Sequence, residues 1–134
     1  MTDITKSADA GLTRGEYSHP QTRQAGVEIA AGDALYIDTN GKFQKAGTAA
    51  VYTGATGTVA FAGLAPRAIA SGTFGEVYGR GAEFYYADSG IVVPSTIWGS
   101  ATAGKLGDAK VGSAADLPIA EAVSATNIVL IRGI

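Results

Sequence analysis

The chain has 134 residues, a length that fits one domain and permits a substantial hydrophobic core. It contains no cysteine, so disulfides, thiol nucleophiles and thiolate metal sites are excluded. The formal net charge is -2 and the ten Lys and Arg residues are spread along the chain, so we expect no nucleic-acid partner, which requires a clustered basic surface.

The first 25 residues are polar and carry few large apolar side chains, and glycines and Pro20 interrupt any periodic pattern. No apolar segment follows a basic one here, and no apolar run anywhere reaches membrane length, so we expect a soluble protein made in a cytoplasm. Fully extended, this segment spans roughly 80 Å at about 3.3 Å per residue. Because it has no core of its own, we predict that residues 1–25 form an extended N-terminal arm, either disordered or laid on a partner.

Residues 26–134 read as a β-rich body of short strands separated by glycine. In Ala34–Asp38, Leu35 and Ile37 lie on one face of a predicted strand, and Lys42–Lys45 is its returning partner. Asn40-Gly41 between them predicts a type I′ turn, in which both central residues have φ > 0.

The middle of the body is less regular. Residues 46–60 are rich in Ala, Gly and Thr and indicate a long loop or a weak strand pair. Pro66 interrupts the apolar residues on either side of it, which favours an edge strand or a bend. Phe74–Tyr78 and Glu83–Tyr86 then predict a hairpin that turns at Gly79–Gly81.

Towards the C-terminal side, Ile91–Pro94 is a candidate for a short buried strand, with Trp98 in the loop that follows. Ile119–Val123 and Asn127–Arg132 predict two strands, and the apolar run Ile128–Ile131 is typical of a strand covered on both faces.

No stretch has helical spacing over three turns, and turn signals recur every eight to twelve residues or so. We therefore predict an all-β fold, a small barrel or sandwich of short glycine-punctuated hairpins. Three segments, around Gly32, Gly72 and Gly104, each place a glycine just before a strand-like run. Repeated hairpins that each begin with a glycine are one way to build a barrel. The alternative is that the low complexity of the sequence produces this similarity by chance.

Few side chains suggest chemistry, and we predict no catalytic, cofactor-binding or metal-binding residues. His19 is the single histidine and lies in the flexible arm, whereas a hydrolytic base needs a rigid, oriented setting. Glu76 and Glu83 face each other across the Gly79–Gly81 turn in the predicted hairpin, where a solvated pair is favoured over a glycosidase site. Five isolated aspartates favour roles in turns over a weak calcium site assembled in space: Asp33, Asp38, Asp88, Asp108 and Asp116.

Four aromatic residues are candidates for trimer or surface contacts: Phe84, Tyr85, Tyr86 and Trp98. Strand alternation turns at least one of the three consecutive rings at 84–86 away from the core. Exposed aromatic rings serve as contacts for sugar or protein, and ordinary packing is the alternative.

The chain resembles the small decoration, or cement, proteins that bind the outside of tailed-phage capsids. The resemblance covers roughly residues 27–134 and does not extend to residues 46–60 or the aromatic run at 84–86. It rests on the order of motifs made of common turn and strand residues: AAGDALYIDTNGKFQKA at 30–46, FAGLA at 61–65, ASGT at 70–73, EVYG at 76–79, TAGKLG at 102–107 and PIAEAVSATNIVLI at 118–131.

This resemblance implies a β-rich homotrimer that binds the major capsid protein at three-fold or quasi-three-fold positions, with its N-terminal segment on the shell. It implies synthesis in the host cytoplasm, a final location on the virion surface, and shell stabilisation without catalysis, membrane or cofactor. We take as candidate capsid contacts Leu12, Arg14, Tyr17, His19 and Arg23. The alternative is a module displayed on a virion that binds carbohydrate or a host surface weakly through Tyr85, Tyr86 or Trp98.

Overall fold

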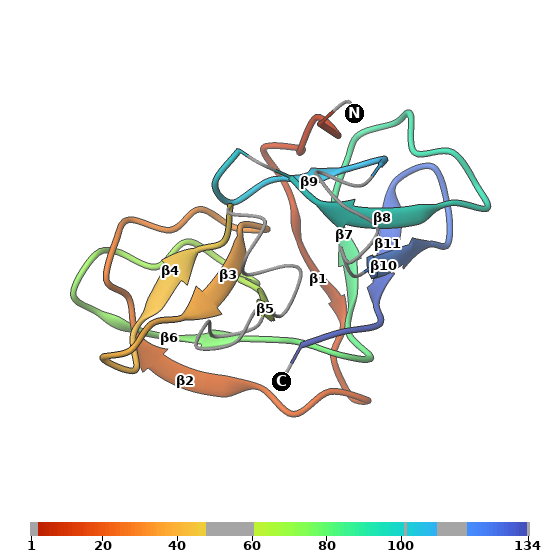
Figure 1. Ribbon diagram of the computed structural model, residues 1–134. Coiled ribbons are helices and arrows are strands. Elements are labelled where there is room, and N and C mark those ends of the chain that lie inside the picture. Colours follow the sequence, from red (N-terminus) through yellow and green to blue (C-terminus); the bar gives the residue numbers. More distant parts are fainter. Residues whose placement is uncertain (1–2, 48–60, 101, 110–117, 134) are drawn as a thin grey trace.

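The computed structural model describes residues 3–47, 61–100, 102–109 and 118–133 (Figure 1). The all-β prediction is confirmed: these residues contain eleven antiparallel strands in three sheets and no helix. The sheets do not close into a barrel. The strands are β1 Gly11–Arg14, β2 Gln21–Gln24, β3 Ala34–Ile37, β4 Phe43–Lys45, β5 Phe61–Leu64, β6 Phe74–Val77, β7 Glu83–Tyr85, β8 Thr96–Gly99, β9 Leu106–Gly107, β10 Pro118–Ala122 and β11 Asn127–Leu130.

The largest sheet has six strands in the order β1-β7-β11-β10-β8-β9. Alternation along its strands sends Phe84, Ile97, Ile128 and Leu130 into the larger of two hydrophobic cores. Val129 lies between two of these residues and is only half-buried, so the run at 128–131 alternates and is not covered on both faces as predicted.

The other two sheets, β2-β6 and β4-β3-β5, enclose the smaller core. Single bridges join them, Leu64 to Tyr78 and Ala25 to Phe43. Phe43, Leu35 and Ile29 are fully buried between them. In Figure 1 this part of the molecule lies to the left and the six-stranded sheet to the right.

Four strands begin with the same type II turn, in which the third residue is a glycine. The fourth residue of each turn donates its N–H to the carbonyl of the first, over 3.0 to 3.1 Å. The third position requires φ > 0, and the four glycines have φ between +81° and +92°. They are Gly32 before β3, Gly72 before β6, Gly81 before β7 and Gly104 before β9. Gly32, Gly72 and Gly104 are the three glycines of the repeated pattern noted in the sequence. Gly81 occupies a fourth such turn, which that repeated pattern did not include.

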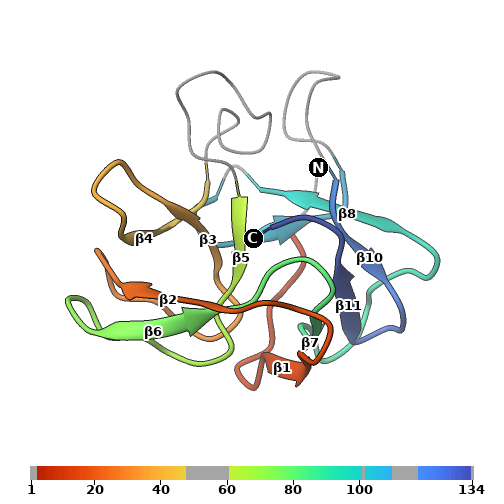
Figure 2. The ribbon, with the colours of Figure 1, turned by 90° about the horizontal axis from the view of Figure 1, so that it is seen from below.

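Residues 3–25 are extended, but they do not reach away from the body as the predicted arm did. β1 pairs with β7, and β2 pairs with β6 over four residues (Figure 2). Before β1, Ile4 and Ser7 donate backbone hydrogen bonds to Leu106 and Tyr86. Backbone pairing requires no large side chains, so a search for apolar residues missed this attachment.

Strand partners also differ from prediction after Gly79–Gly81. The turn exists, but β6 and β7 do not pair with each other: the chain passes there from the small β2-β6 sheet to the six-stranded sheet. By contrast, β10 and β11 form the expected hairpin.

Two further predictions were wrong. Ile91–Pro94 does not form a strand. It is not a buried segment either, because only Ile91 is buried while Val92 and Val93 are exposed. Trp98 lies in β8, not in a loop. The predicted loop at 46–60 lies mostly outside the described residues.

The β3-β4 hairpin forms as predicted, but its turn is not type I′. Only Gly41 has φ > 0, and Gly41 donates to the carbonyl of Asp38 across a type I turn. The Asp38 carboxylate accepts hydrogen bonds from Asn40 N, Lys42 N and Gln44 Nε2, at 2.8 to 2.9 Å. These bonds, Gln44's first, hold the pKa of Asp38 below its usual value.

Gly72→Ala and Gly81→Ala separate backbone strain from crowding in the same turn. Gly72 has open space where a Cβ would lie, so we expect a loss of about 1–2 kcal/mol from the left-handed backbone alone. A Cβ on Gly81 would lie 2.6 Å from the Tyr17 carbonyl oxygen, so we expect at least about 1 kcal/mol more. Urea unfolding measures both free energies, and equal losses would contradict this account.

Asp38→Asn tests the charge on the hairpin carboxylate. A folded-state pKa below the unfolded value stabilises the protein above the unfolded pKa, near 3.9, and this contribution disappears as pH falls through the lowered value. We expect Asp38→Asn to destabilise by about 1 kcal/mol at pH 7 and the difference to disappear as pH falls through the lowered pKa of Asp38. Urea unfolding across pH checks this, and a pH-independent difference would assign the effect to geometry.

Candidate functional site

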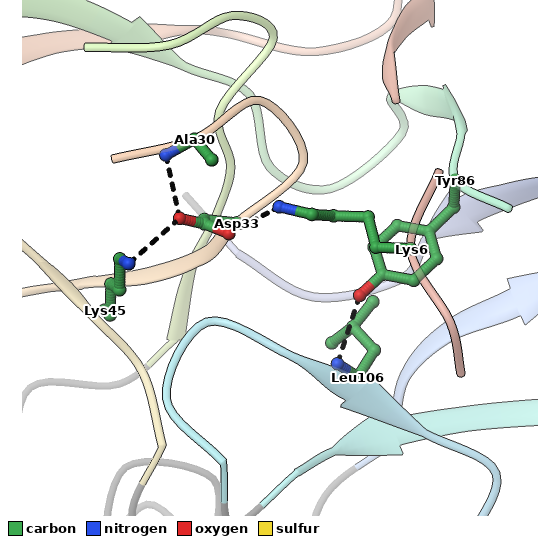
Figure 3. Close-up of polar contacts among 6 residues, drawn as sticks. All are labelled: Lys6, Ala30, Asp33, Lys45, Tyr86 and Leu106. Carbon is green, nitrogen blue, oxygen red and sulfur yellow. Dashed lines mark hydrogen bonds and ion pairs between the residues drawn. The ribbon is translucent and has the colours of Figure 1, made fainter. Parts of the chain in front are cut away.

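The most buried ion pair lies at the first glycine turn, where Asp33 joins three segments of the chain (Figure 3). Lys6 Nζ is 2.6 Å from Asp33 Oδ1, and Lys45 Nζ is 3.6 Å from Oδ2. The backbone N–H of Ala30 donates to Oδ2 over 2.8 Å. The Asp33 and Lys6 side chains are only 9% and 14% exposed, so each depends on the other for compensation of its charge.

Tyr86 lies beside this ion pair. Its hydroxyl accepts a hydrogen bond from the backbone N–H of Leu106 over 3.2 Å, and its ring is fully buried in the larger core (Figure 3). Burial raises the pKa of Tyr86 far above its usual value, so the phenol stays neutral. Tyr86 therefore packs and accepts a hydrogen bond, and has no acid–base role at ordinary pH.

The arrangement around Asp33 suits a structural role better than chemistry. Two ammonium groups neutralise one carboxylate and use its lone pairs, which is unsuited to metal coordination. Within residues 3–47, 61–100, 102–109 and 118–133, no group of three His, Asp or Glu side chains is arranged to hold a metal ion. The cluster ties the N-terminal segment to the start of β3 and to β4.

Asp33 and Asp38 accept hydrogen bonds from the backbone of their own turns, as predicted for the aspartates. Asp88 accepts instead from the hydroxyls of Ser7 and Tyr85, at 2.6 and 2.7 Å. Asp108 is exposed, and Asp116 lies outside the described residues.

The five predicted capsid contacts divide into two groups. Leu12 is half-buried against the larger core, and Arg23 donates to Gln21 and to the Gly41 carbonyl within its own chain. Arg14, Tyr17 and His19 are exposed, at the end of β1 and on its connection to β2. Only these last three present free surface to a partner.

Arg14 and Tyr17 form the core of this exposed group. The Arg14 guanidinium lies 5.9 Å from the centroid of the Tyr17 ring and 3.3 Å from Glu83 Oε1. Asn127 donates to the other Glu83 oxygen over 2.8 Å. Tyr17 is 73% exposed, the largest fraction among the large apolar side chains of the described chain, so its ring is available for contact.

The aromatic candidates follow strand alternation. Phe84 and Tyr86 are fully buried in the larger core, which corrects their prediction as trimer or surface contacts. Tyr85 and Trp98 are half-buried, and each lies between buried neighbours, so both belong to the opposite face of the six-stranded sheet. They are separated by β11 and β10, roughly 14 Å at about 4.8 Å per strand.

Glu76 and Glu83, weighed above as a carboxylate pair, lie in different sheets. Glu76 is opposite Thr22 in β2, and Glu83 binds Arg14 and Asn127. They are not the cross-strand pair predicted from the hairpin.

Sequence reasoning missed one exposed aromatic residue, Phe74, which is 71% exposed at the start of β6. It borders a shallow hollow of about 320 Å³ that Thr22, Arg67 and Glu76 also line. Phe74 lies two residues before Glu76 and shares a face of β6 with it. This spacing from a charged side chain was the sequence signal that Phe74 is exposed.

A second hollow, of about 450 Å³, lies between the N-terminal segment, the 89–95 loop, β8 and Asp108, which follows β9. Asp3 and Asp108 contribute its acidic lining and Ile91 and Val92 its apolar lining. The sequence offered no signal for it, because the contributing segments are far apart in the chain.

Comparison with protein-family models and with curated proteins finds no match for this chain. Within the described residues, there is no helix of the length and apolarity needed to cross a membrane.

Asp33→Ala leaves Lys6 with a largely buried charge and Ala30 with an unpaired N–H. We expect it to lower the free energy of unfolding by about 2–4 kcal/mol. Lys6→Met keeps an apolar stem and leaves Asp33 its bonds to Lys45 and Ala30, so its loss is smaller. Chemical denaturation measures both, and an Asp33→Ala loss below about 1 kcal/mol, as for an exposed pair, contradicts the structural role.

Proposed function

We propose that this protein is a structural component of a tailed-phage virion that binds the outer capsid surface and strengthens the shell. The observation that carries the proposal is the ordered resemblance of residues 27–134 to capsid decoration proteins. In the fold, its longest motifs coincide with whole units: residues 30–46 hold the first glycine turn and the β3-β4 hairpin, and residues 118–131 hold the β10-β11 hairpin.

Binding without catalysis fits the physical task. A clip that touches several capsid subunits gains from effective concentration, because each contact after the first is intramolecular. Many modest contacts then suffice, and a homotrimer multiplies them by symmetry. His19 is exposed on the β1–β2 connection, a position that suits a contact residue better than an oriented general base.

The β1–β2 connection is the proposed capsid contact, with Arg14, Tyr17 and His19 as its exposed side chains. An aromatic ring with an arginine over it is the kind of pair that carries binding energy at protein interfaces. Because β1 and β2 belong to the sheets, the connection is presented on a fixed base and not on a free arm.

Glycan binding on a virion surface is the second candidate. Tyr85 and Trp98 favour it, since both lie on the outward face of the six-stranded sheet. Their separation by two intervening strands places them too far apart to stack on one sugar ring, so the capsid contact is preferred.

Cosedimentation of the purified protein with capsids that lack it tests the function directly. We expect saturable binding with a copy number that matches the three-fold positions of the shell. Absence of binding refutes the proposal, and saturable glycan binding without capsid binding promotes the second candidate.

Tyr17→Ala tests the contact surface within the same assay. We expect capsid affinity to fall about tenfold or more, because an exposed aromatic anchor is lost while the fold is untouched. Phe74→Ala is the matched control, since it removes an equally exposed ring at the far end of the β2-β6 sheet. An equal effect of the two variants contradicts the assignment. Deletion of residues 1–20 is unsuitable, because it removes β1 from the body.

A further inference from the structure

Three backbone segments meet beside the exposed connection between β1 and β2: residues 15–20, the 79–82 turn and residues 131–133. A Cβ on Gly81 would lie 2.6 Å from the Tyr17 carbonyl oxygen, and one on Gly133 would lie 2.9 Å from Gly79 Cα. Gly81 also donates to the Leu130 carbonyl over 2.9 Å. Figures 1 and 2 both place the three segments side by side, near the C-terminal end.

These segments carry an exposed aromatic and basic surface, which we call the basic corner: Tyr17, His19, Arg80 and Arg132. Tyr17, His19 and Arg80 are exposed, and Arg132 is half-buried. In a chain whose net charge is -2, a surface of two arginines and the only histidine is a local reversal of sign.

Among the described residues, three cations form ion pairs with carboxylates, and the two arginines of the basic corner are not among them. Arg14 forms ion pairs with Glu16 and Glu83, and Lys6 and Lys45 share Asp33. Within the described part of the chain, neither Arg80 nor Arg132 forms an ion pair. Glu16 and Glu83 are the acidic residues nearest in sequence to the basic corner, and both already form ion pairs with Arg14.

Two polar atoms at this place are buried and lack a hydrogen-bond partner, Arg132 Nε and Ser18 Oγ. They are the only such side-chain atoms found among the described residues. An unpaired buried donor is costly, and a group of this kind calls for an explanation such as a missing ligand. Both atoms belong to segments of the basic corner.

We infer that the basic corner binds an acidic segment of a protein partner. Carboxylates supply the acceptors that Arg80 and Arg132 lack, and arginine binds them with matched, bidentate geometry. An exposed tyrosine beside arginines is typical of protein interfaces. Nucleic acid is disfavoured, because two arginines neutralise few phosphates and the rest of the chain is acidic overall.

Where the partner is the major capsid protein, the inference rests on the function proposed above and adds the chemistry of the contact. It predicts that the capsid surface under the basic corner is acidic, and that arginines outside the predicted N-terminal contacts take part.

Arg80→Glu is the central variant, because Arg80 is exposed in a turn and its replacement leaves the fold intact. In capsid cosedimentation at low salt, we expect Arg80→Glu to bind about tenfold more weakly than wild type. At roughly 0.3 M salt, we expect most of the wild-type binding to be lost too, because salt screens the charges. Lys105→Glu is the matched control: it reverses an exposed charge in another of the four glycine turns and leaves binding unchanged. Equal affinities for Arg80→Glu and wild type overturn the inference while the proposed function stands.

A capsid-free measurement keeps the two proposals apart. Titration of the ¹⁵N-labelled protein with a hexaglutamate peptide should shift amide signals of residues 15–20, 79–82 and 131–133, and Arg80→Glu or Arg132→Gln should abolish those shifts. Shifts elsewhere, or none, overturn the inference even if capsids bind. Preferential binding of single-stranded DNA or of a neutral glycan at the same residues also overturns the inference. Self-association that Arg80→Glu removes overturns it as well, because the surface would then serve contacts between copies of the chain.

Discussion

At each of the four glycine turns, the glycine N–H donates to a carbonyl of a segment distant in sequence. Gly32, Gly72, Gly81 and Gly104 donate to Ala65, Ala25, Leu130 and Ala46, over 2.7 to 2.9 Å. All four acceptor residues are buried, so a lost bond would leave a carbonyl unpaired away from water. The turn thus fixes both where a strand begins and which segment lies beside it. The bond from Gly104 to Ala46 links the entry of β9 to the end of β4, and so joins the six-stranded sheet to its smaller neighbour.

The sequence was informative where local chemistry decides structure. Alternation identified β3 and β6, short apolar segments identified β10 and β11, and the repeated glycine pattern marked three of the four turns. It was not informative about which strands pair, because a strand's partner is set by contacts between distant residues. The turn at 79–82 illustrates this: its glycines predicted a turn correctly, but nothing local distinguishes a hairpin from a passage between sheets.

The candidate site divides in the same way. Alternation predicted correctly that one ring of 84–86 points outward, but could not say that Phe84 and Tyr86 are the two inside. The N-terminal contacts were chosen from residue type alone, and the structure reduced five to three exposed side chains. Arg80 and Arg132 were beyond sequence reasoning, because they become neighbours of Tyr17 only through the fold.

The position of β11 within the six-stranded sheet has a consequence for how the chain folds. β11 lies between β7 and β10, and β7 in turn holds β1, so the first strand is bound to the body through segments synthesised much later. Arg14 and Glu83, which meet across β1 and β7, are 69 residues apart, and Ser100 and Asp3 are 97 apart. Contacts at such separations require large loops to close first, which slows folding. During synthesis, the six-stranded sheet remains incomplete until β11 leaves the ribosome, so its strand edges stay open to other chains for most of translation.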